Sequence, residues 1–268
     1  MTNVVFIHGL WVAQSAWQPW IEYFAAQGHQ AVALPWPGEQ ASIEATRAHP
    51  ETQAGYGIDA LTDHFAALLD GFDTSPVVIG HSFGGLIAQK LLVQNRAAAA
   101  VAIDPAPIKG IRALPSAQLR SALPVLGNPR NRKRAVALTQ EQWRYGFGNA
   151  LTAAESDALW QQWSIPSPGK PLFEAATANF VLGSPAAVDT ARGDRGPLLI
   201  TGGSVDHTVP LSTARAAHRL YRRSEAVTDF HEFEGRGHSL TIDHGWRDVA
   251  DVSLAWLAHR ATDAPARP

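Results

Sequence analysis

The 268-residue chain contains no cysteine and only one methionine. The absence of cysteine excludes disulfide bonds, thiol catalysis and metal sites built on thiolates. Charge is also scarce: Asp, Glu, Lys and Arg make up 17% of the residues and nearly cancel, which leaves a formal net charge of −2. A balance this close to neutral gives no electrostatic footprint for nucleic acid or for an anionic membrane surface. We therefore expect neither as a partner.

The sequence also lacks a long hydrophobic run. No uninterrupted apolar stretch approaches the ~20 residues of a membrane-spanning helix. A strand-like run begins almost directly after Met1-Thr2-Asn3, so we expect no signal peptide and, by default, a cytoplasmic location. Hydrophobic residues nevertheless make up 46% of the chain. At this length they are enough for one substantial core.

Short apolar runs alternate with helical patterns along much of the chain. The runs typical of strands lie at residues 4–7, 31–34, 76–79, 99–103, 197–201 and 227–233. Apolar residues recur at helical spacing in residues 59–69 and 84–92. This alternation is typical of an α/β protein, in which ligands bind beyond the carboxyl ends of the strands.

The segment Gly80-His81-Ser82-Phe83-Gly84 stands where one of these strands gives way to a helix. G-x-S-x-G in this position is typical of a nucleophile elbow, a tight turn that lifts a serine hydroxyl out of the sheet. Glycines two residues on either side are needed because a Cβ there would collide with the turn. The helix N-terminus then directs free N–H groups at charge that develops beside the serine. Ser82 is the predicted nucleophile.

A serine nucleophile needs a base, and the base needs a carboxylate that orients it. In this class of site the acid and then the histidine follow the serine along the chain. Asp206 comes just after a buried strand, and His238 lies in a glycine-flanked loop after an alternating strand. Asp104 ends another strand and competes with Asp206, but it precedes Pro105, a pairing that more often starts a turn. We predict the triad Ser82, Asp206 and His238.

An oxyanion hole would complete the site. One donor is expected to be the N–H of Phe83, the residue after the nucleophile. The second is expected from His8-Gly9-Leu10-Trp11, which directly follows the first strand. Gly9 permits the turn, and the amide of Leu10 would then point inward.

In this order the four motifs, strand-His-Gly, Gly-His-Ser-Phe-Gly-Gly, Gly-Gly-Ser-Val-Asp and Gly-Arg-Gly-His, resemble the α/β-hydrolase superfamily. The resemblance covers residues 4 to about 261. It implies a doubly wound, mostly parallel sheet with helices on both faces and a helical cap inserted after the strand that ends at Asp104.

Residues 8–20 are similar to the esterase and hydroxynitrile lyase branch of this superfamily. Leu10 and Ser239 stand where the lyases have threonine and lysine, which argues against cyanohydrin cleavage. Haloalkane dehalogenases and epoxide hydrolases use an aspartate at the elbow, so Ser82 argues against both.

The resemblance suggests a division into domains. Residues 1–104 and 195–262 are expected to form the hydrolase core, and residues 105–194 the cap, because there the strand pattern gives way to Pro, Arg, Trp and short helical pieces. The basic run at residues 130–134 is interpreted as a solvated helix start or loop. Residues 263–268 are expected to be a disordered tail.

We predict a cofactor-independent serine hydrolase that cleaves a carboxylic ester, lactone or related acyl compound through an acyl-enzyme on Ser82. The substrate is a small molecule with an apolar part, because the cap segment is rich in aromatic residues. Trp11, next to the oxyanion turn, and Trp143 in the cap are the expected substrate contacts. No metal site is expected, and a homodimer is left open.

Two alternatives remain at this point. The same triad could serve carbon–carbon bond hydrolysis, thioester hydrolysis or a cyclisation in secondary metabolism, since all pass through similar oxyanions. The chain could also be a non-catalytic ligand-binding protein that retains a hydrolase shell. An intact Ser-Asp-His set argues for the enzyme, because a binding protein has no physical need for all three residues.

Overall fold

The structure, a computed structural model, describes residues 2–260. The expected tail at residues 263–268 lies outside them. Six strands form a central sheet: β1 (Asn3–Ile7), β2 (Gln30–Ala33), β3 (Val77–His81), β4 (Ala99–Ile103), β7 (Leu198–Gly203) and β8 (Thr228–Phe233). Their order is β2-β1-β3-β4-β7-β8, and every neighbouring pair is parallel. The strand order reverses at β1, because β2 lies on one side of β1 and β3 and all later strands lie on the other. In open α/β sheets ligands bind at such a switch point.

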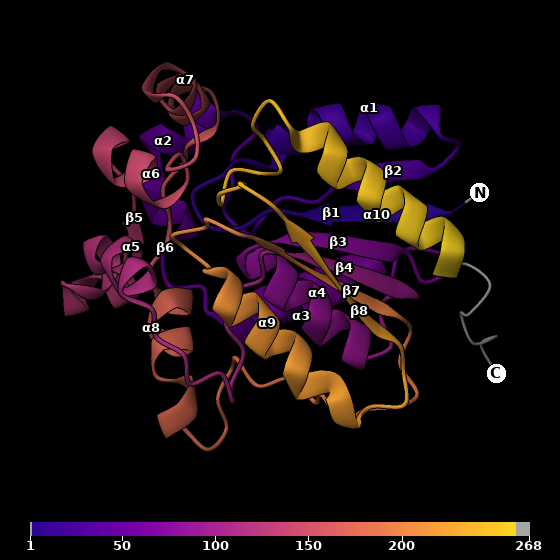
Figure 1. Ribbon diagram of the computed structural model, residues 1–268. Coiled ribbons are helices and arrows are strands. Elements are labelled where there is room, and N and C mark those ends of the chain that lie inside the picture. The colour runs from indigo at the N-terminus through magenta and orange to yellow at the C-terminus, as the bar shows by residue number, and fades with distance from the viewer. Residues whose placement is uncertain (1, 261–268) are drawn as a thin grey trace.

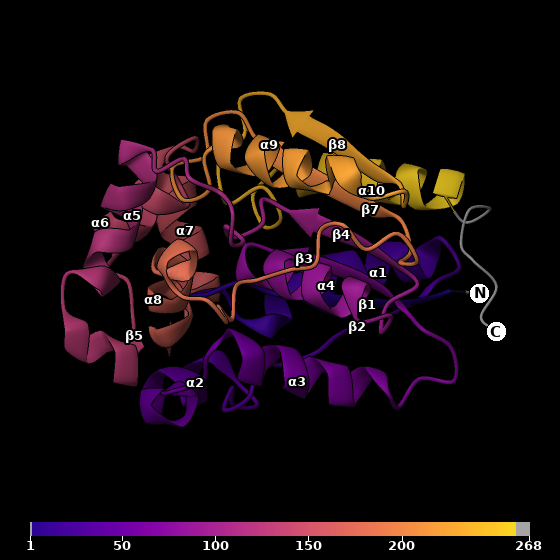
Figure 2. The same ribbon diagram turned by 90° about the horizontal axis from the view of Figure 1, so that it is seen from below.

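Helices cover both faces of this sheet (Figure 1). One face carries α1 (Gln18–Ala26) and α10 (Trp246–Arg260), and the other carries α3 (Ile58–Leu69), α4 (Phe83–Val93) and α9 (Leu211–Leu220). Seen from below, α4 and α9 lie in front of the sheet, and α1 and α10 lie behind it (Figure 2). This arrangement confirms the predicted α/β fold with a doubly wound sheet.

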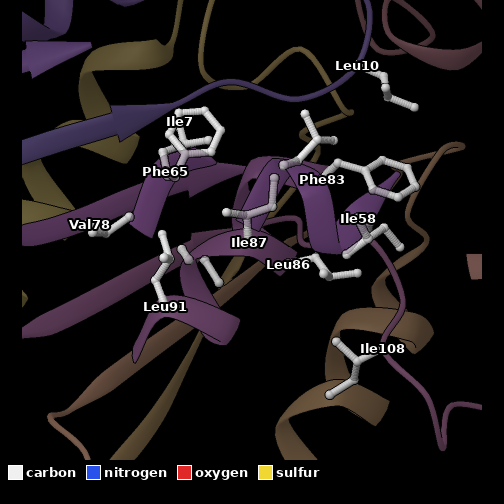
Figure 3. Close-up of a cluster of buried hydrophobic side chains, with 14 of the residues drawn as sticks. Ile7, Leu10, Ile58, Phe65, Val78, Phe83, Leu86, Ile87, Leu91 and Ile108 are labelled. Carbon is white, nitrogen blue, oxygen red and sulfur yellow. The ribbon is translucent and has the colours of Figure 1, made fainter. Parts of the chain in front are cut away.

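Two hydrophobic cores follow from the alternation of side chains along each strand. In β1, Val5 and Ile7 face α3 and α4, whereas Val4 and Phe6 face α1 and α10. Figure 3 shows the first core, where Ile7 and Val78 from the sheet meet side chains of α3 and α4. Every residue of α4 is buried. The helix that follows Ser82 is therefore packed against neighbouring residues on every face.

Residues 105–194 add no strand to the main sheet. They form α5 (Ser116–Leu126), β5 (Ala135–Val136), α6 (Gln140–Gly146), α7 (Ala153–Trp163), β6 (Ser167–Pro168) and α8 (Lys170–Ala176). These elements gather, with α2 (Ile43–Ala48), at the carboxyl end of the sheet (Figure 1). The sequence predicted only helical pieces here. The two strands form a small antiparallel ribbon, and at two residues each they are too short to produce a periodic pattern.

Single-turn 3₁₀ helices lie at Gln14–Trp17, Pro50–Gln53, Pro129–Lys133, Ala178–Phe180 and Tyr221–Arg223. None of the helices within residues 2–260 has both the length and the apolar character needed to cross a bilayer.

Candidate active site

Ser82 forms the one-residue turn between β3 and α4. Its backbone has φ +56° and ψ −119°, a conformation that a residue with a side chain rarely adopts. Its N–H donates to the carbonyl of Ile103 at 2.9 Å, and its own carbonyl accepts from Gly85 at 2.9 Å and from Ala106 at 2.9 Å. Surrounding structure thus holds the strained turn in place, an arrangement common at active sites.

The glycines of the motif are required by their neighbours. A Cβ on Gly80 would lie 2.1 Å from the carbonyl oxygen of Gly84, and a Cβ on Gly84 would lie 2.2 Å from that of Ile7. Both distances are far inside van der Waals contact with backbone that cannot move aside. Glycine is therefore required at both positions for β1, β3 and α4 to approach this closely.

His238 is fully buried and is bound to Asp206. Its Nδ1 lies 2.6 Å from the Asp206 Oδ2. An ionised carboxylate only accepts hydrogen bonds, so Nδ1 donates, and in the neutral ring Nε2 is the nitrogen that can take a proton. Nε2 is buried and has no hydrogen-bond partner within residues 2–260. The ring lies 4.6 Å, between centroids, from that of His81, the residue before Ser82. His238 therefore lies beside the elbow with its base nitrogen free.

Backbone donors and a second acid hold Asp206. Its Oδ1 accepts from the N–H groups of Thr208 at 2.6 Å and Val209 at 2.8 Å. Burial alone would raise the pKa of Asp206, but the attraction of His238 and hydrogen bonds from His238, Asp104 and Val209 hold that pKa below its ordinary value. Asp206 is therefore ionised and stabilises the conjugate acid of His238.

Asp104, the competing carboxyl, lies in the same cluster. Both of its oxygens accept from the Gly203 N–H, at 3.1 and 3.2 Å. Its burial and the neighbouring charge of Asp206 raise the pKa of Asp104 well above the ordinary value, which favours the protonated form of Asp104 beside the Asp206 carboxylate. Among the described residues, Asp104, Asp206 and His238 are the one group of three potential metal ligands with atoms this close, all within 4.8 Å.

The turn after β1 lies against Ser82. A Cβ on Gly9 would lie 2.7 Å from the Ser82 Cβ and 3.3 Å from its Oγ, so only glycine fits there. The N–H groups of Leu10 and Phe83 make no hydrogen bond to any residue that the structure describes. Two free donors beside a serine hydroxyl have the chemistry of an oxyanion hole.

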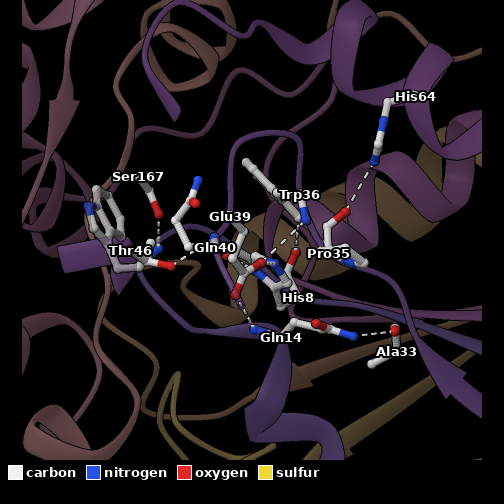
Figure 4. Close-up of polar contacts among 12 residues, drawn as sticks. His8, Gln14, Ala33, Pro35, Trp36, Glu39, Gln40, Thr46, His64 and Ser167 are labelled. Carbon is white, nitrogen blue, oxygen red and sulfur yellow. Dashed lines mark hydrogen bonds and ion pairs between the residues drawn. The ribbon is translucent and has the colours of Figure 1, made fainter. Parts of the chain in front are cut away.

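A buried polar network fixes this turn from behind (Figure 4). The His8 Nδ1 lies 2.8 Å from the Gly9 carbonyl, and Nε2 lies 2.9 Å from a carboxylate oxygen of Glu39. Burial would raise the pKa of Glu39, but His8 and backbone N–H groups of Gln14 and Trp36 hold it below its ordinary value. A carboxylate only accepts hydrogen bonds, so the His8 Nε2 donates to Glu39. Nothing in the sequence pointed to this pair, whose members are 31 positions apart.

A cavity of about 700 Å³ opens beside Ser82. Most of its lining is apolar and comes from the stretch between Asp104 and the end of α5, from α8 and from the turn after α8. Trp11, Phe83 and Val209 close it next to Ser82. A smaller hollow of about 370 Å³ lies at the far ends of α3 and α4, away from the elbow. The larger cavity is therefore the one that could hold a reacting molecule.

The sequence model of the alpha/beta hydrolase family matches residues 4–252. The chain belongs to this alpha/beta hydrolase family. An extracellular alpha/beta-hydrolase from a Paenibacillus species is similar in structure, with 19% identity, coverage of 95% of this chain and 98% of that one, and a TM-score of 0.66. The monoacylglycerol lipase of Paleococcus ferrophilus has 21% identity, 96% and 94% coverage, and a TM-score of 0.66.

A thermophilic esterase from Thermogutta terrifontis is also similar to this alpha/beta hydrolase, with 17% identity, coverage of 97% of this chain and 90% of that one, and a TM-score of 0.67. At these identities the likeness shows the fold alone. No curated protein matches the sequence.

The two tryptophans expected to contact substrate occupy different places in this alpha/beta hydrolase. Trp11 lines the cavity. Trp143 does not: it is fully buried and stacks on Phe147, with 4.3 Å between ring centroids. Phe147 in turn places its edge against the ring of His238, at 4.9 Å. Trp143 therefore belongs to the packing behind Phe147, which in turn contacts His238.

Proposed function

We propose that this protein is a serine hydrolase that cleaves a carboxylic ester or a related acyl compound with an apolar part. The observation that carries the proposal is the strained turn at Ser82, which opens into the large cavity beside a buried histidine with a free Nε2. Acyl transfer uses each of these groups: a nucleophile on a strained turn, a base nitrogen free to take a proton, and two unpaired N–H groups that can bind an oxyanion. None of them stabilises the fold.

The proposed mechanism assigns one role to each group. Ser82 Oγ attacks the acyl carbonyl while the His238 Nε2 takes its proton, and Asp206 fixes the tautomer and stabilises the imidazolium. The N–H groups of Leu10 and Phe83 bind the oxyanion of the tetrahedral intermediate. His238 returns the proton to the leaving alcohol, then activates a water that releases the acid from Ser82. No cofactor takes part in these steps.

The apolar walls of the cavity support an apolar acyl or aryl group in the substrate. Residues 105–194 supply most of these walls, and we propose that they form a cap over Ser82 that sets the substrate range. Two solved structures similar to this chain are an esterase and a monoacylglycerol lipase, which supports ester chemistry. Lactone and thioester hydrolysis and cleavage of a diketone use the same groups and are distinguished by experiment.

Two measurements test the proposal. A fluorophosphonate probe should label the parent protein and leave Ser82→Ala unlabelled, while the two circular dichroism spectra agree. Labelling of the folded variant, or none of the parent, would overturn the assignment of Ser82. A panel of ester, lactone, thioester and diketone substrates should then show the highest kcat/KM with an ester. If the parent is not labelled and no member of the panel turns over, the protein is a binding protein that retains a hydrolase shell.

A further inference from the structure

The mouth of the cavity is surrounded by exposed apolar side chains. The nine most exposed large hydrophobic residues within residues 2–260 include six from one region: Leu114 (64% exposed), Leu119 (42%), Leu123 (59%), Phe180 (89%), Val181 (44%) and Leu182 (100%). We name these six residues the apolar rim. Monomeric proteins rarely leave a contiguous apolar patch in water unless it binds something.

Hydrogen bonds show that the parts of the rim lie together. The ammonium group of Lys109 donates to the carbonyls of Val181 at 2.6 Å and Leu182 at 2.8 Å. The side-chain amide of Asn179 accepts from the Gly110 N–H and donates to the Ile111 carbonyl, both at 2.7 Å. The turn that carries Val181 and Leu182 is therefore fastened beside the stretch that leads to Leu114.

The rim is continuous with the cavity. Leu119 and Leu123 are one turn apart on the same face of α5. Leu114, Leu119 and Phe180 also line the cavity that reaches Ser82. An apolar chain could therefore pass from the rim to the elbow along a lining that is mostly apolar.

Positive charge accompanies the rim. Residues 105–140 contain seven Lys and Arg residues and no Asp or Glu: Lys109, Arg112, Arg120, Arg130, Arg132, Lys133 and Arg134. Arg112 and the run at residues 130–134 are largely exposed, and within the described residues none of these cations pairs with an acid. The 3₁₀ turn at Pro129–Lys133 packs against α5 and α8, next to the rim. The net charge of −2 for the whole chain does not reveal this local excess of positive charge, because the remaining residues contain more Asp and Glu than Lys and Arg.

We propose that the apolar rim and the cations beside it dock on an anionic lipid surface, and that the substrate is an ester whose apolar chain enters the cavity from that surface. Exposed leucine and phenylalanine side chains partition into the headgroup and acyl boundary, and nearby Lys and Arg are attracted to anionic headgroups. A lipid surface is favoured over a protein partner because the rim leads into the apolar cavity. The docking stands by itself, whereas the substrate rests on the proposed function.

Co-sedimentation with vesicles tests the docking. The full chain should bind vesicles of phosphatidylcholine mixed with phosphatidylglycerol, bind vesicles of phosphatidylcholine alone about 10-fold or more weakly, and lose binding as salt is raised. The double variant Leu123→Ser/Leu182→Ser, which alters the rim without touching the cavity lining, should lower binding about 10-fold or more. The matched control Val32→Ser/Leu68→Ser changes two exposed apolar residues elsewhere and should bind like the parent.

Three results would overturn the docking: no binding by the parent, equal binding to both kinds of vesicle, or equal binding by the rim variant. A parent that is dimeric and ignores vesicles, with a monomeric rim variant, would instead assign the rim to contact between copies of the chain.

Activity measurements separate the docking from the proposed function. The rim variant should hydrolyse a soluble acetate ester like the parent but lose most of its rate on a long-chain ester embedded in the anionic vesicles. Equal loss on both esters would overturn the assignment of the substrate. If neither protein hydrolyses either ester while vesicle binding still depends on the rim, the proposed function fails and the docking remains.

Discussion

The carboxyl groups of Asp104 and Asp206 lie together in one buried cluster, where the Asp206 Oδ2 is 2.6 Å from the His238 Nδ1. The two acids that compete in the sequence therefore lie in one cluster with different protonation states. Asp206 is ionised because His238 and backbone donors surround it, and Asp104 is neutral because it is buried next to that charge. The geometry favours Asp206 as the triad acid and gives Asp104 the place of a neutral support behind it.

This relationship predicts opposite outcomes for two matched substitutions. Asp206→Asn should lower kcat about 10⁴-fold, because the amide stabilises the wrong imidazole tautomer. Asp104→Asn should keep most of the activity, because its amide group can donate to Asp206 as the neutral carboxyl does. Steady-state kinetics on an activated aryl ester would measure both. A larger fall in kcat for Asp104→Asn than for Asp206→Asn would make Asp104 the acid that orients His238 and Asp206 the supporting group.

The raised pKa of Asp104 also predicts how stability depends on pH. The folded state holds this proton more tightly than the unfolded state, so the stabilisation is complete below the ordinary carboxyl pKa and is lost as pH rises toward the raised value. Asp104→Asn cannot ionise and should gain stability relative to the parent by about 1.4 kcal/mol for each pH unit in that window. Urea unfolding at a series of pH values from about 4 upward would measure the difference. A difference that does not change with pH would show that Asp104 is ionised in the folded protein.

The buried pair of His8 and Glu39 predicts a loss of both stability and turnover. Glu39→Gln weakens the buried hydrogen bonds that the carboxylate accepts from His8 and from the Gln14 and Trp36 N–H groups, which should cost about 1–3 kcal/mol of unfolding free energy. Because His8 fixes the turn that carries the Leu10 N–H, kcat should fall more than KM changes. The exposed pair of His49 and Glu51 supplies the control: Glu51→Gln should change stability by about 1 kcal/mol or less and leave kcat alone. If Glu39→Gln folds and its kcat is unchanged, the pair of His8 and Glu39 does not position the Leu10 N–H for the reaction.

Trp143 should matter for packing and not for specificity. Its indole is fully buried against Phe147, so Trp143→Ala should cost about 3–5 kcal/mol through the cavity that it leaves. The ratio of kcat/KM values for a bulky and a small ester should stay near that of the parent. The same ratio should change in a variant with a narrowed cavity, such as Ala122→Phe, because Ala122 lines it. A changed ratio in folded Trp143→Ala would restore Trp143 as a substrate contact.

The sequence predicts well the features that local sterics enforce. The elbow is recognisable because contacts of Gly80 and Gly84 with backbone allow no other residue there. The strands of the sheet are recognisable because burial on both faces demands continuous apolar runs, as in Val77–His81. The parallel sheet and its helices could be predicted for this reason.

The sequence cannot show what depends on contacts between distant segments. Asp104 and Asp206 both follow strands, and only the fold shows which one reaches His238. His8 and Glu39 meet across a loop that no periodic pattern describes. Trp11 and Trp143 are both buried, and only the fold shows that Trp11 lines the cavity whereas Trp143 stacks on Phe147.

Trp11 joins the turn after β1 to two residues of the 105–194 segment. Its N–H donates to the Ser167 hydroxyl at 2.6 Å, and its indole donates to the Val136 carbonyl at 3.0 Å. Its φ of +67° is held between these contacts and the Gly9 turn. Both acceptors come from residues 105–194, so a change of backbone there that displaces either one would also displace the turn that carries the Leu10 N–H. A search for variants with a new substrate range should therefore leave Val136 and Ser167 unchanged and vary the residues that line the cavity.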